Sequence, residues 1–419
     1  MKIALIIEHF DAARGGAEQY AVWLAGQLAQ AGHEVHVLCH DRGRFFAKYS
    51  EAKRRASHEV EHAAEPYTPP LETHPGLTAV HVHRFPTMKL STALGFCRFG
   101  QAARRWCAAH RPDVAHSMTV AWPGDLYHPH AGLYARLQGQ AVASRETAAA
   151  ARWKRWMLRL SRKQRALLDL ERRATGPTGP WKILCVSPLL QRDFQEVYAA
   201  PPQRLILLEN PRMTPVPIGG QVLQARRWFR RMYRLDDTAR VALFVGHDFR
   251  RKGLAWAIRV IAATPVPWTL IVVGLGRARR YMELAQQLVV ADRIKFIGPT
   301  QCMAEVYSAA DALLLPTFYD SFGLVALEAV GWGLPVISTR FLGVGELLQR
   351  HGLGTIVESP RAVQAMAAAL AAIDPRTVDR AAAAQHAAAA TAHLTPSVYL
   401  AKLTELYRQC ALAQHQRAR

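Results

Sequence analysis

Short apolar runs alternate with helical patterns along the first half of the chain. The opening run, Lys2–Ile7, leads into a polar loop with glycines, a helical pattern over Gln19–Ala31 and a second apolar run over Glu34–Cys39. A strand, a helix and a strand in this order build parallel sheets. Two further strands are predicted at Leu77–Val82 and Val114–His116. The polar, basic stretch over residues 42–73 is expected to be a long loop beside the active cleft.

Strands alternate with helices again after Asn210-Pro211, where Thr214–Gly220 has the composition of a linker. The strands expected there are Val241–Val245, Trp268–Val273, Arg293–Ile297, Ala312–Leu315 and Pro335–Ser338. We therefore predict an α/β protein with two Rossmann-like, doubly wound domains facing a cleft, residues 1–210 and 211–395. Residues 396–419 are expected to form a helix that crosses back toward the first domain.

Composition fits this division and excludes several classes of protein. A chain of 419 residues is long enough for two domains, and 50% hydrophobic against 20% charged residues describes globular rather than disordered chains. No apolar run is long enough to span a membrane, and the opening run is interrupted by Glu8 and His9, unlike a signal peptide. The six cysteines show no C-x-x-C pairing, which favours reduced thiols in the cytoplasm over zinc or disulfides.

The charge balance is strongly basic, with 53 Lys and Arg against 32 Asp and Glu, a formal net charge of +21. Such an excess favours an anionic partner, unless it reflects a general basic bias of the source proteome. The segment 146–174 is predicted to be helical and interleaves Arg and Lys with tryptophan, methionine and leucine. Trp153–Leu170 therefore suits an anionic membrane surface. The alternative is an amphipathic helix packed on its own domain with a solvated basic face.

Candidate chemistry begins at Leu315, where a buried strand is predicted to end. A helix is expected to start around Ser321–Gly323, and the free N–H groups and positive dipole end at such a start suit a diphosphate. Asp320 lies just outside this helix, and Glu328 lies about two turns along it, where a carboxylate can accept two vicinal ribose hydroxyls.

A second candidate is the loop that carries Arg250, Arg251, Lys252 and Gly253 after the strand Val241–Val245. Fixed cations facing the start of the helix would neutralise a leaving diphosphate. The glycine pair at the first loop, Gly15-Gly16, is not a dinucleotide fingerprint, because no third glycine follows at the required offset.

In these motifs the chain resembles the family 4 glycosyltransferases, whose signature is an acidic residue, seven others, Glu, Ala and a Gly-x-Pro-Val strand start. Asp320 stands where the family usually has Glu, one methylene longer. The resemblance implies a retaining GT-B enzyme in which Asp320, Arg251, Lys252 and His130 are catalytic, His130 being preferred over His128 for the donor sugar's 6-hydroxyl. Asp125 is a further candidate for acceptor contact. The donor-binding positions that the resemblance implies are Gly15, Gly16, Gly246, Arg251, Lys252, Gly274, Ile297, Asp320, Phe322, Gly323, Leu324, Val325 and Glu328.

The basic segment, the loop Phe249–Gly253 and the glycine loop at Gly15-Gly16 together look most like the lipopolysaccharide core glucosyltransferases, which use UDP-glucose and a heptose acceptor. This implies a nucleotide-sugar donor, a phosphorylated or lipid-linked glycan acceptor, and a peripheral position on the cytoplasmic face of the inner membrane. No Asp-x-Asp motif stands in a convincing context, so we expect no metal and no cofactor beyond the donor.

Four alternatives remain open. Asp320 in place of the family's Glu leaves a catalytically inactive scaffold as one of them. The chain could be a family 4 transferase with another nucleotide sugar and another kind of acceptor. A nucleotide-sugar epimerase of the same fold would require acid and base groups that the Asp320–Glu328 pattern does not suggest. A nucleic-acid-binding protein is motivated only by the net charge, and no recognition module for DNA or RNA is found.

Overall fold

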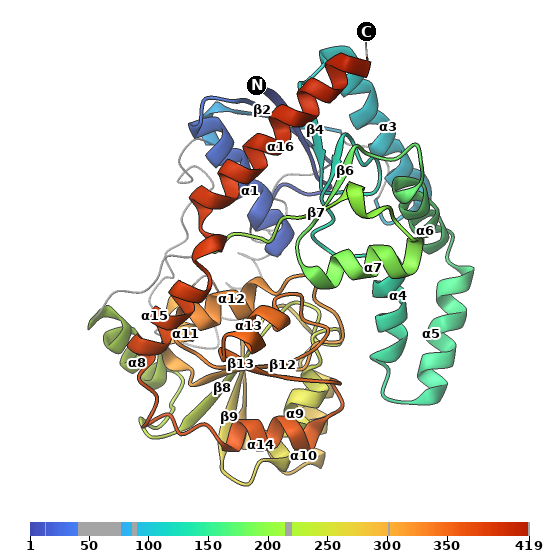
Figure 1. Ribbon diagram of the computed structural model, residues 1–419. Helices are drawn as coiled ribbons and strands as arrows, with labels where there is room; N and C mark the ends of the chain where they lie inside the picture. The colour runs from blue at the N-terminus through green and yellow to red at the C-terminus, as the bar shows by residue number, and fades with distance from the viewer. Residues whose placement is uncertain (13, 41–76, 86–89, 214–219, 301, 418–419) are drawn as a thin grey trace. The chain divides into compact units, whose positions relative to one another are not determined.

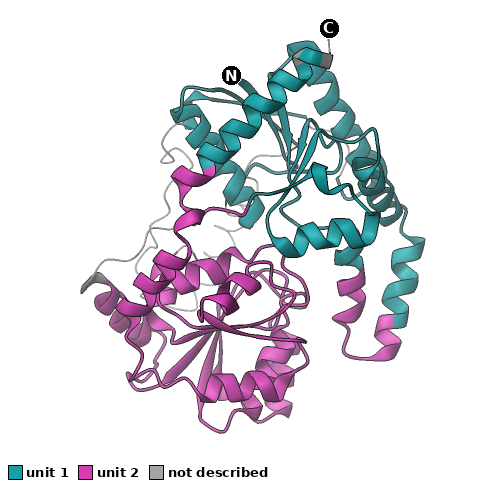
Figure 2. Ribbon diagram, in the orientation of Figure 1, with its two compact units in different colours: residues 1–138, 152–208, 400–419 teal, residues 139–151, 209–399 magenta. Residues whose placement is uncertain are grey.

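The computed structural model describes residues 1–12, 14–40, 77–85, 90–213, 220–300 and 302–417 (Figure 1). The predicted loop over residues 42–73 and nearly all of the predicted linker at 214–220 lie outside these ranges. The chain divides into two compact units (Figure 2). Unit 1 comprises residues Met1–Gln138, Arg152–Leu208 and Leu400–Arg419, and unit 2 comprises Gly139–Ala151 and Glu209–Tyr399.

Unit 1 is built on a parallel sheet of seven strands in the order β3-β2-β1-β4-β5-β6-β7. The first strand, β1 (Lys2–Ile6), pairs with β2 (Glu34–Cys39) on one side and with β4 (Val114–Ser117) on the other. The strand order therefore reverses between β1 and β4. The other strands are β3 (Val80–Arg84), β5 (Leu126–Tyr127), β6 (Lys182–Cys185) and β7 (Leu205–Leu207).

Polar side chains cap some of the helices of unit 1. Ser187 accepts a hydrogen bond from the Leu190 N–H at 3.1 Å, and Thr92 accepts one from the Gly95 N–H at 3.1 Å. The helices are α1 (Gly16–Gln30), α3 (Ala93–His110), α6 (Arg162–Thr175) and α7 (Pro188–Tyr198). Three further helices contain residues of both units: α4 (Tyr134–Ala143), α5 (Ala148–Leu160) and α16 (Pro396–Arg417).

The basic segment 146–174 is helical, as predicted, but it forms two helices, α5 and α6, instead of one. The break falls at Ser161, whose backbone is extended and whose hydroxyl accepts a hydrogen bond from the Gln164 N–H. A serine competes with the helical backbone for hydrogen bonds, so it favours the first position of a helix over the interior.

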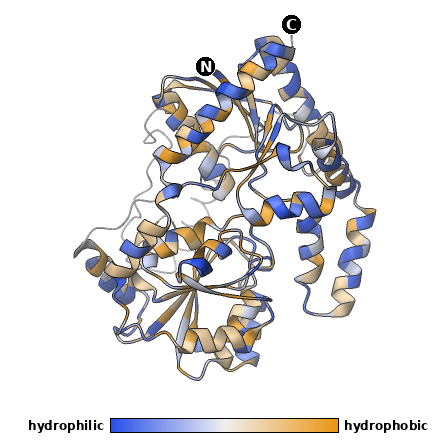
Figure 3. Cartoon of the chain, in the orientation of Figure 1, coloured by the Kyte–Doolittle hydropathy of each residue, from blue (hydrophilic) through white to orange (hydrophobic). Residues whose placement is uncertain are grey.

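Unit 2 is built on a second parallel sheet, of six strands, in the order β10-β9-β8-β11-β12-β13. The strands are β8 (Arg240–Val245), β9 (Trp268–Val273), β10 (Ile294–Gly298), β11 (Ala312–Leu315), β12 (Val336–Thr339) and β13 (Gly354–Val357). The order reverses between β8 and β11. Two of these strands, β11 and β12, are buried along their whole length, and Figure 3 shows hydrophobic colouring within this sheet.

The helices of unit 2 alternate with its strands, as parallel pairing requires. They are α8 (Gly220–Met232), α9 (Leu254–Ala263), α10 (Arg279–Gln287), α11 (Met303–Ala309), α12 (Leu324–Gly331), α13 (Gly345–Arg350), α14 (Val363–Ala371) and α15 (Arg380–Ala390). The predicted class, α/β with two doubly wound parallel sheets, is confirmed. Within the described ranges, no helix combines the length and the apolar character needed to cross a bilayer.

Candidate functional site

The candidate site of unit 2 lies where its strand order reverses, at the carboxyl ends of β8 and β11. Ligands of open α/β sheets bind outside the carboxyl ends of the strands at such a reversal. The loop after β8 runs from Gly246 to Gly253, and the loop after β11 runs from Pro316 to Gly323. Both loops were singled out by the sequence, and the sheet order places them side by side.

Hydrogen bonds and an ion pair join the two loops. The Phe318 N–H donates to the carbonyl oxygen of Arg251 at 2.8 Å, and the Arg251 guanidinium donates to the carbonyl oxygen of Tyr319 at 2.7 Å. The Lys252 ammonium group donates to the carboxylate of Asp320, 68 residues away in the sequence. The structure thus brings together Arg251, Lys252 and Asp320, which the sequence placed in two separate motifs.

The ion pair of Lys252 and Asp320 is largely shielded from solvent, with the side chains 11% and 14% exposed. Burial by itself raises the pKa of Asp320, but the charges of Lys252 and Arg251 outweigh it and hold that pKa below its ordinary value. Asp320 is therefore an ionised carboxylate, and it faces a cationic loop.

Helix α12 begins directly behind this pair. It starts at Leu324, so Phe322 and Gly323 precede it instead of forming its first turn as expected. Gly323 has φ of 99°, and a Cβ atom there would lie 2.3 Å from Leu342 Cδ1, so the position requires glycine. No side chain caps this helix, so its first N–H groups, including those of Leu324 and Val325, are suited to an anion.

Glu328 lies in the second turn of α12, and a neighbouring helix fixes its carboxylate. The hydroxyl group of Tyr307, in α11, donates to Oε2 of Glu328 at 2.7 Å. Burial raises the pKa of Glu328 to about 7, although this hydrogen bond lowers it. Glu328 therefore changes its charge near neutral pH.

Three predicted positions line the carboxyl ends of β8, β9 and β10. The Gly246 N–H donates to the carbonyl oxygen of Val273, and the Gly274 N–H donates to that of Gly298, both at 3.0 Å. Gly274 has φ of 139°, and a Cβ atom there would lie 1.9 Å from the Gly246 carbonyl oxygen. Ile297 is the last residue before Gly298 in β10. The backbones of these loops therefore approach as closely as only glycine allows.

The remaining predicted residues lie in unit 1. Gly15 and Gly16 open α1, after β1, and His130 follows β5. The rings of His130 and Tyr20 of α1 lie 4.0 Å apart, and those of His130 and His128 lie 4.1 Å apart. Burial lowers the pKa of His130 to about 3, so this imidazole is neutral at physiological pH.

Asp125, the further acceptor candidate, lies elsewhere in unit 1. Its carboxylate accepts a hydrogen bond from the Ala115 N–H at 2.8 Å, at the amino end of β5. His130 follows the carboxyl end of the same strand, so the two residues flank opposite ends of β5.

Sequence reasoning missed two polar residues at the two strand reversals and a third that contacts Glu328. Glu8, at the carboxyl end of β1, accepts a 2.6 Å hydrogen bond from the Thr119 hydroxyl beyond β4, and burial raises its pKa. His247 Nδ1 accepts a 3.1 Å hydrogen bond from the Leu275 N–H. The third residue is Tyr307. A signal existed only for Glu8, since a carboxylate that interrupts an apolar run at a strand end is unusual.

Two family models match the chain. The one described as "Glycosyltransferase Family 4" matches residues 14–214, and the one described as "Glycosyl transferases group 1" matches residues 239–373. Among curated proteins, the lipopolysaccharide glucosyltransferase WaaG of Escherichia coli is 28% identical over 211 residues, 49% of this chain and 56% of that enzyme. A D-inositol 3-phosphate glycosyltransferase of Thermobispora bispora is 27% identical over 94% of this chain and 91% of its own length.

Solved structures share the fold along nearly the whole chain. The crystal structure of WaaG superposes with a TM-score of 0.70 at 21% identity, covering 98% of both chains. Anabaena HepE in complex with UDP-glucose superposes with a TM-score of 0.67 at 16% identity, covering 98% of this chain and all of HepE. The arrangement of two Rossmann-like units in these proteins is the GT-B fold.

Proposed function

Because the chain belongs to family 4 of the glycosyltransferases, a retaining family, we propose that it transfers glucose from UDP-glucose to a lipopolysaccharide core or another membrane-linked glycan. The single observation that carries the donor side of this proposal is the joining of Arg251, Lys252 and Asp320 at the start of α12. WaaG and HepE support the identity of the donor sugar, since one is named a glucosyltransferase and the other is solved with UDP-glucose.

The leaving diphosphate is proposed to bind between the cationic loop and α12. Arg251 and Lys252 supply positive charge. The N–H groups of Leu324 and Val325 lie at the N-terminus of α12, which is the positive end of the helix dipole. Charge that develops on the leaving phosphate would meet donors that are already in place, and such preorganised groups contribute most to the stabilisation of transition states.

Glu328 is proposed to bind the ribose, and Asp320 the transferred sugar. An ionised carboxylate can accept two vicinal hydroxyl groups, and Tyr307 fixes its orientation. Gly246 and Gly274 would leave room for the nucleotide against backbone alone, and the backbone of Ile297 would contact the base. His130, held neutral by burial, can donate or accept one hydrogen bond at a sugar hydroxyl without contributing charge.

Retention is proposed to follow from attack on the face from which the diphosphate departs. The bond from the anomeric carbon to the phosphate oxygen breaks, and a bond to the acceptor oxygen forms on the same face. The acceptor hydroxyl gives its proton to the leaving phosphate. The residues named above then act by positioning and by stabilising charge.

The acceptor is proposed to be anionic and held at a membrane. On α5, the side chains of Trp153, Trp156, Met157 and Leu160 are 48–60% exposed, and the two indole rings stack at 4.9 Å. Arginines at 152, 155 and 159 lie on the same helix. Apolar and aromatic residues beside cations suit the headgroup region of an anionic bilayer. The free state of all six cysteines supports the predicted cytoplasmic face of the inner membrane.

Calorimetric titration tests the donor side, with UDP, UDP-glucose, GDP and ADP added to the protein and to Glu328→Ala. We expect UDP to bind and Glu328→Ala to weaken it at least 100-fold, since two hydrogen bonds to a charged group contribute about 3 kcal/mol or more. The matched control, Glu283→Ala, removes an exposed carboxylate from α10 and should leave binding unchanged. A preference for GDP or ADP would change the donor, and an absence of nucleotide binding would overturn the proposal.

Transfer and membrane binding are measured separately. Radiolabelled glucose from UDP-glucose should appear in purified lipopolysaccharide core that ends in heptose; labelling of an inositol phosphate instead would replace the proposed acceptor.

Membrane binding is measured by cosedimentation, and Trp153→Ala/Trp156→Ala should reduce cosedimentation with phosphatidylglycerol vesicles. Leu94→Ala/Leu412→Ala, which removes two other exposed apolar side chains, should not. Equal losses in both variants would contradict a role for α5 in membrane binding.

A further inference from the structure

Helix α8, at the beginning of unit 2, presents two faces of different chemistry, and both are rich in arginine. The segment from Gly220 to Arg234 contains five arginines and no acidic residue. Four of them lie in the helix and form an inner pair, Arg226 and Arg230, and an outer pair, Arg227 and Arg231; the fifth, Arg234, follows the end of the helix. Residues four apart lie on the same side of a helix, so each pair forms one stripe.

The inner pair is fully occupied by the rest of unit 2. Arg226 donates to Asp311 Oδ1 at 2.7 Å, and Arg230 donates to Asp311 Oδ2 at 3.0 Å. Both guanidiniums also donate to carbonyl oxygens at the end of α11, and Phe229 between them is buried. These contacts fix the rotation of α8, so the opposite face must point away from α11.

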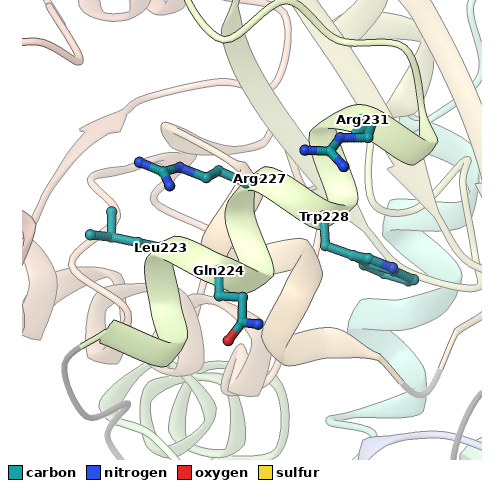
Figure 4. Close-up of a pocket in the computed structure, with 5 residues that line it drawn as sticks. All are labelled: Leu223, Gln224, Arg227, Trp228 and Arg231. Carbon is teal, nitrogen blue, oxygen red and sulfur yellow. The ribbon is translucent and has the colours of Figure 1, made fainter.

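The outer face combines free cations with exposed apolar side chains. Leu223 is 60% exposed, Trp228 42% and Met232 37%. Among the residues that the structure describes, none forms a hydrogen bond or an ion pair with Arg227 or Arg231. A hollow of about 510 Å³ is lined by Leu223, Gln224, Arg227, Trp228 and Arg231, whose side chains all project from this one helix (Figure 4).

We propose that the outer face of α8 docks on an anionic phospholipid bilayer, with Arg227 and Arg231 on lipid phosphates and Trp228 and Leu223 at the boundary of headgroups and acyl chains. A guanidinium group can donate two parallel hydrogen bonds to phosphate oxygens. Tryptophan is suited to the membrane interface because one end of its ring system is apolar and the other is polar. This proposal goes beyond the proposed function, because it concerns unit 2 and does not depend on the donor, the acceptor or α5.

A bilayer fits this face better than a soluble anion does. A free sugar phosphate would engage the two guanidiniums but would leave the exposed leucine and methionine side chains in water. A lipid surface satisfies both halves of the face, because it offers phosphates beside apolar chains. The absence of carboxylates from Gly220 to Arg234 also removes the repulsion that an anionic surface would otherwise meet.

The test is cosedimentation of the full chain with vesicles of phosphatidylcholine containing phosphatidylglycerol, compared with phosphatidylcholine alone. It is carried out with Trp153→Ala/Trp156→Ala in every sample, so that binding through α5 cannot mask the result. Each basic residue near an anionic surface contributes about 1 kcal/mol, or about fivefold. Arg227→Gln/Arg231→Gln should therefore weaken binding about 25-fold.

A charge-matched control separates this face from net charge. Arg279→Gln/Arg376→Gln removes two exposed guanidiniums from other parts of unit 2, where each is paired with a carboxylate. It should lower binding less than twofold. Unchanged UDP affinity and thermal unfolding of Arg227→Gln/Arg231→Gln would show that the variant is folded.

The position of Trp228 gives a second readout. Phospholipids brominated on the acyl chain should quench the protein fluorescence, and Trp228→Phe should reduce that quenching. The proposal would be overturned if Arg227→Gln/Arg231→Gln and Arg279→Gln/Arg376→Gln bound the vesicles equally well and Trp228→Phe left the quenching unchanged. A dimer in sedimentation that Arg227→Gln/Arg231→Gln dissociates without any effect on vesicles would also overturn it, because the face would then be a contact between two copies.

Discussion

The hydroxyl group of Tyr307 donates a hydrogen bond of 2.7 Å to Oε2 of Glu328, across 21 residues of sequence and from one helix of unit 2 to the next. Glu328 is the residue that we propose to bind the ribose, and Tyr307 is buried at 1% exposure. A buried hydroxyl that donates to a carboxylate both orients it and favours its ionised form. Tyr307 is thus a positioning residue for the proposed nucleotide site.

Replacing Tyr307 with phenylalanine should weaken UDP binding about tenfold at pH 7. The variant keeps the ring but loses one hydrogen bond to a charged group, which contributes about 1.5 kcal/mol, and the pKa of Glu328 should rise further. Calorimetric titration measures the affinity. Tyr233→Phe, in the same unit, removes a hydroxyl away from Glu328 and should bind UDP normally. Equal UDP affinities of Tyr307→Phe and Tyr233→Phe would contradict a role for Tyr307 in positioning Glu328 for nucleotide binding.

The raised pKa of Glu328 predicts how stability depends on pH. Its pKa is about 7 in the folded protein and 4.5 as the ordinary value, so the folded state binds the proton more tightly. The stability from this proton is fully present below pH 4.5 and is lost as the pH rises through 7. The loss amounts to about 3 kcal/mol at about 1.4 kcal/mol for each pH unit between the two values.

The measurement is urea unfolding of the protein and of Glu328→Gln between pH 4.5 and 8. Glutamine cannot titrate, so the difference in unfolding free energy between the two proteins should shift by about 3 kcal/mol over this range. Parallel profiles would show that the carboxyl group of Glu328 titrates well below neutral pH.

The pair Lys252–Asp320 should behave as one unit in a double-mutant cycle. Asp320→Asn leaves the Lys252 ammonium buried without a counter-charge, and Lys252→Met does the same to the carboxylate, so each should cost about 3 kcal/mol. The double variant should cost less than the sum by about 2 kcal/mol. Chemical unfolding gives the three free energies, and strictly additive effects would contradict the ion pair.

Gly253 should tolerate no side chain, because a steric clash adds to the strain of its positive φ. Its φ is 82°, and a Cβ atom would lie 1.9 Å from the carbonyl oxygen of Pro316 in the facing loop. Gly32 has almost the same φ, 80°, but nothing lies within 4 Å. Gly32→Ala should cost about 1 kcal/mol from the backbone alone, and Gly253→Ala about 3 kcal/mol, because the clash adds to the strain.

Thermal unfolding and UDP titration distinguish these two effects. Gly253→Ala should lower the melting temperature more than Gly32→Ala and should also weaken UDP binding, since the loop carries Arg251 and Lys252. If Gly253→Ala and Gly32→Ala had the same melting temperature and the same UDP affinity, the loops after β8 and β11 would be able to move apart with little loss of free energy.

Local pattern was sufficient to predict the fold class and the loops that carry the site. Buried strands read as apolar runs, and their alternation with helices determines a parallel sheet. A parallel sheet gathers its loops at the carboxyl ends of the strands, so the motifs around Arg251 and Asp320 had to lie at one edge. The pattern failed where helices are short or amphipathic, as at α8 and α13, and at Ser161, where a single capping residue divides one helical segment into two.

The partners of these residues were decided only by the tertiary structure. The sequence placed Lys252 and Glu328 in their motifs, but the bonds to Asp320 and Tyr307 span 68 and 21 residues. Glu8 likewise meets Thr119 across 111 residues. Hydrophobic periodicity reports which side of an element is buried, yet it contains no information about what lies opposite. Charge and pKa depend on that opposite group and on the water it excludes, so they emerge only when the strands are placed next to one another.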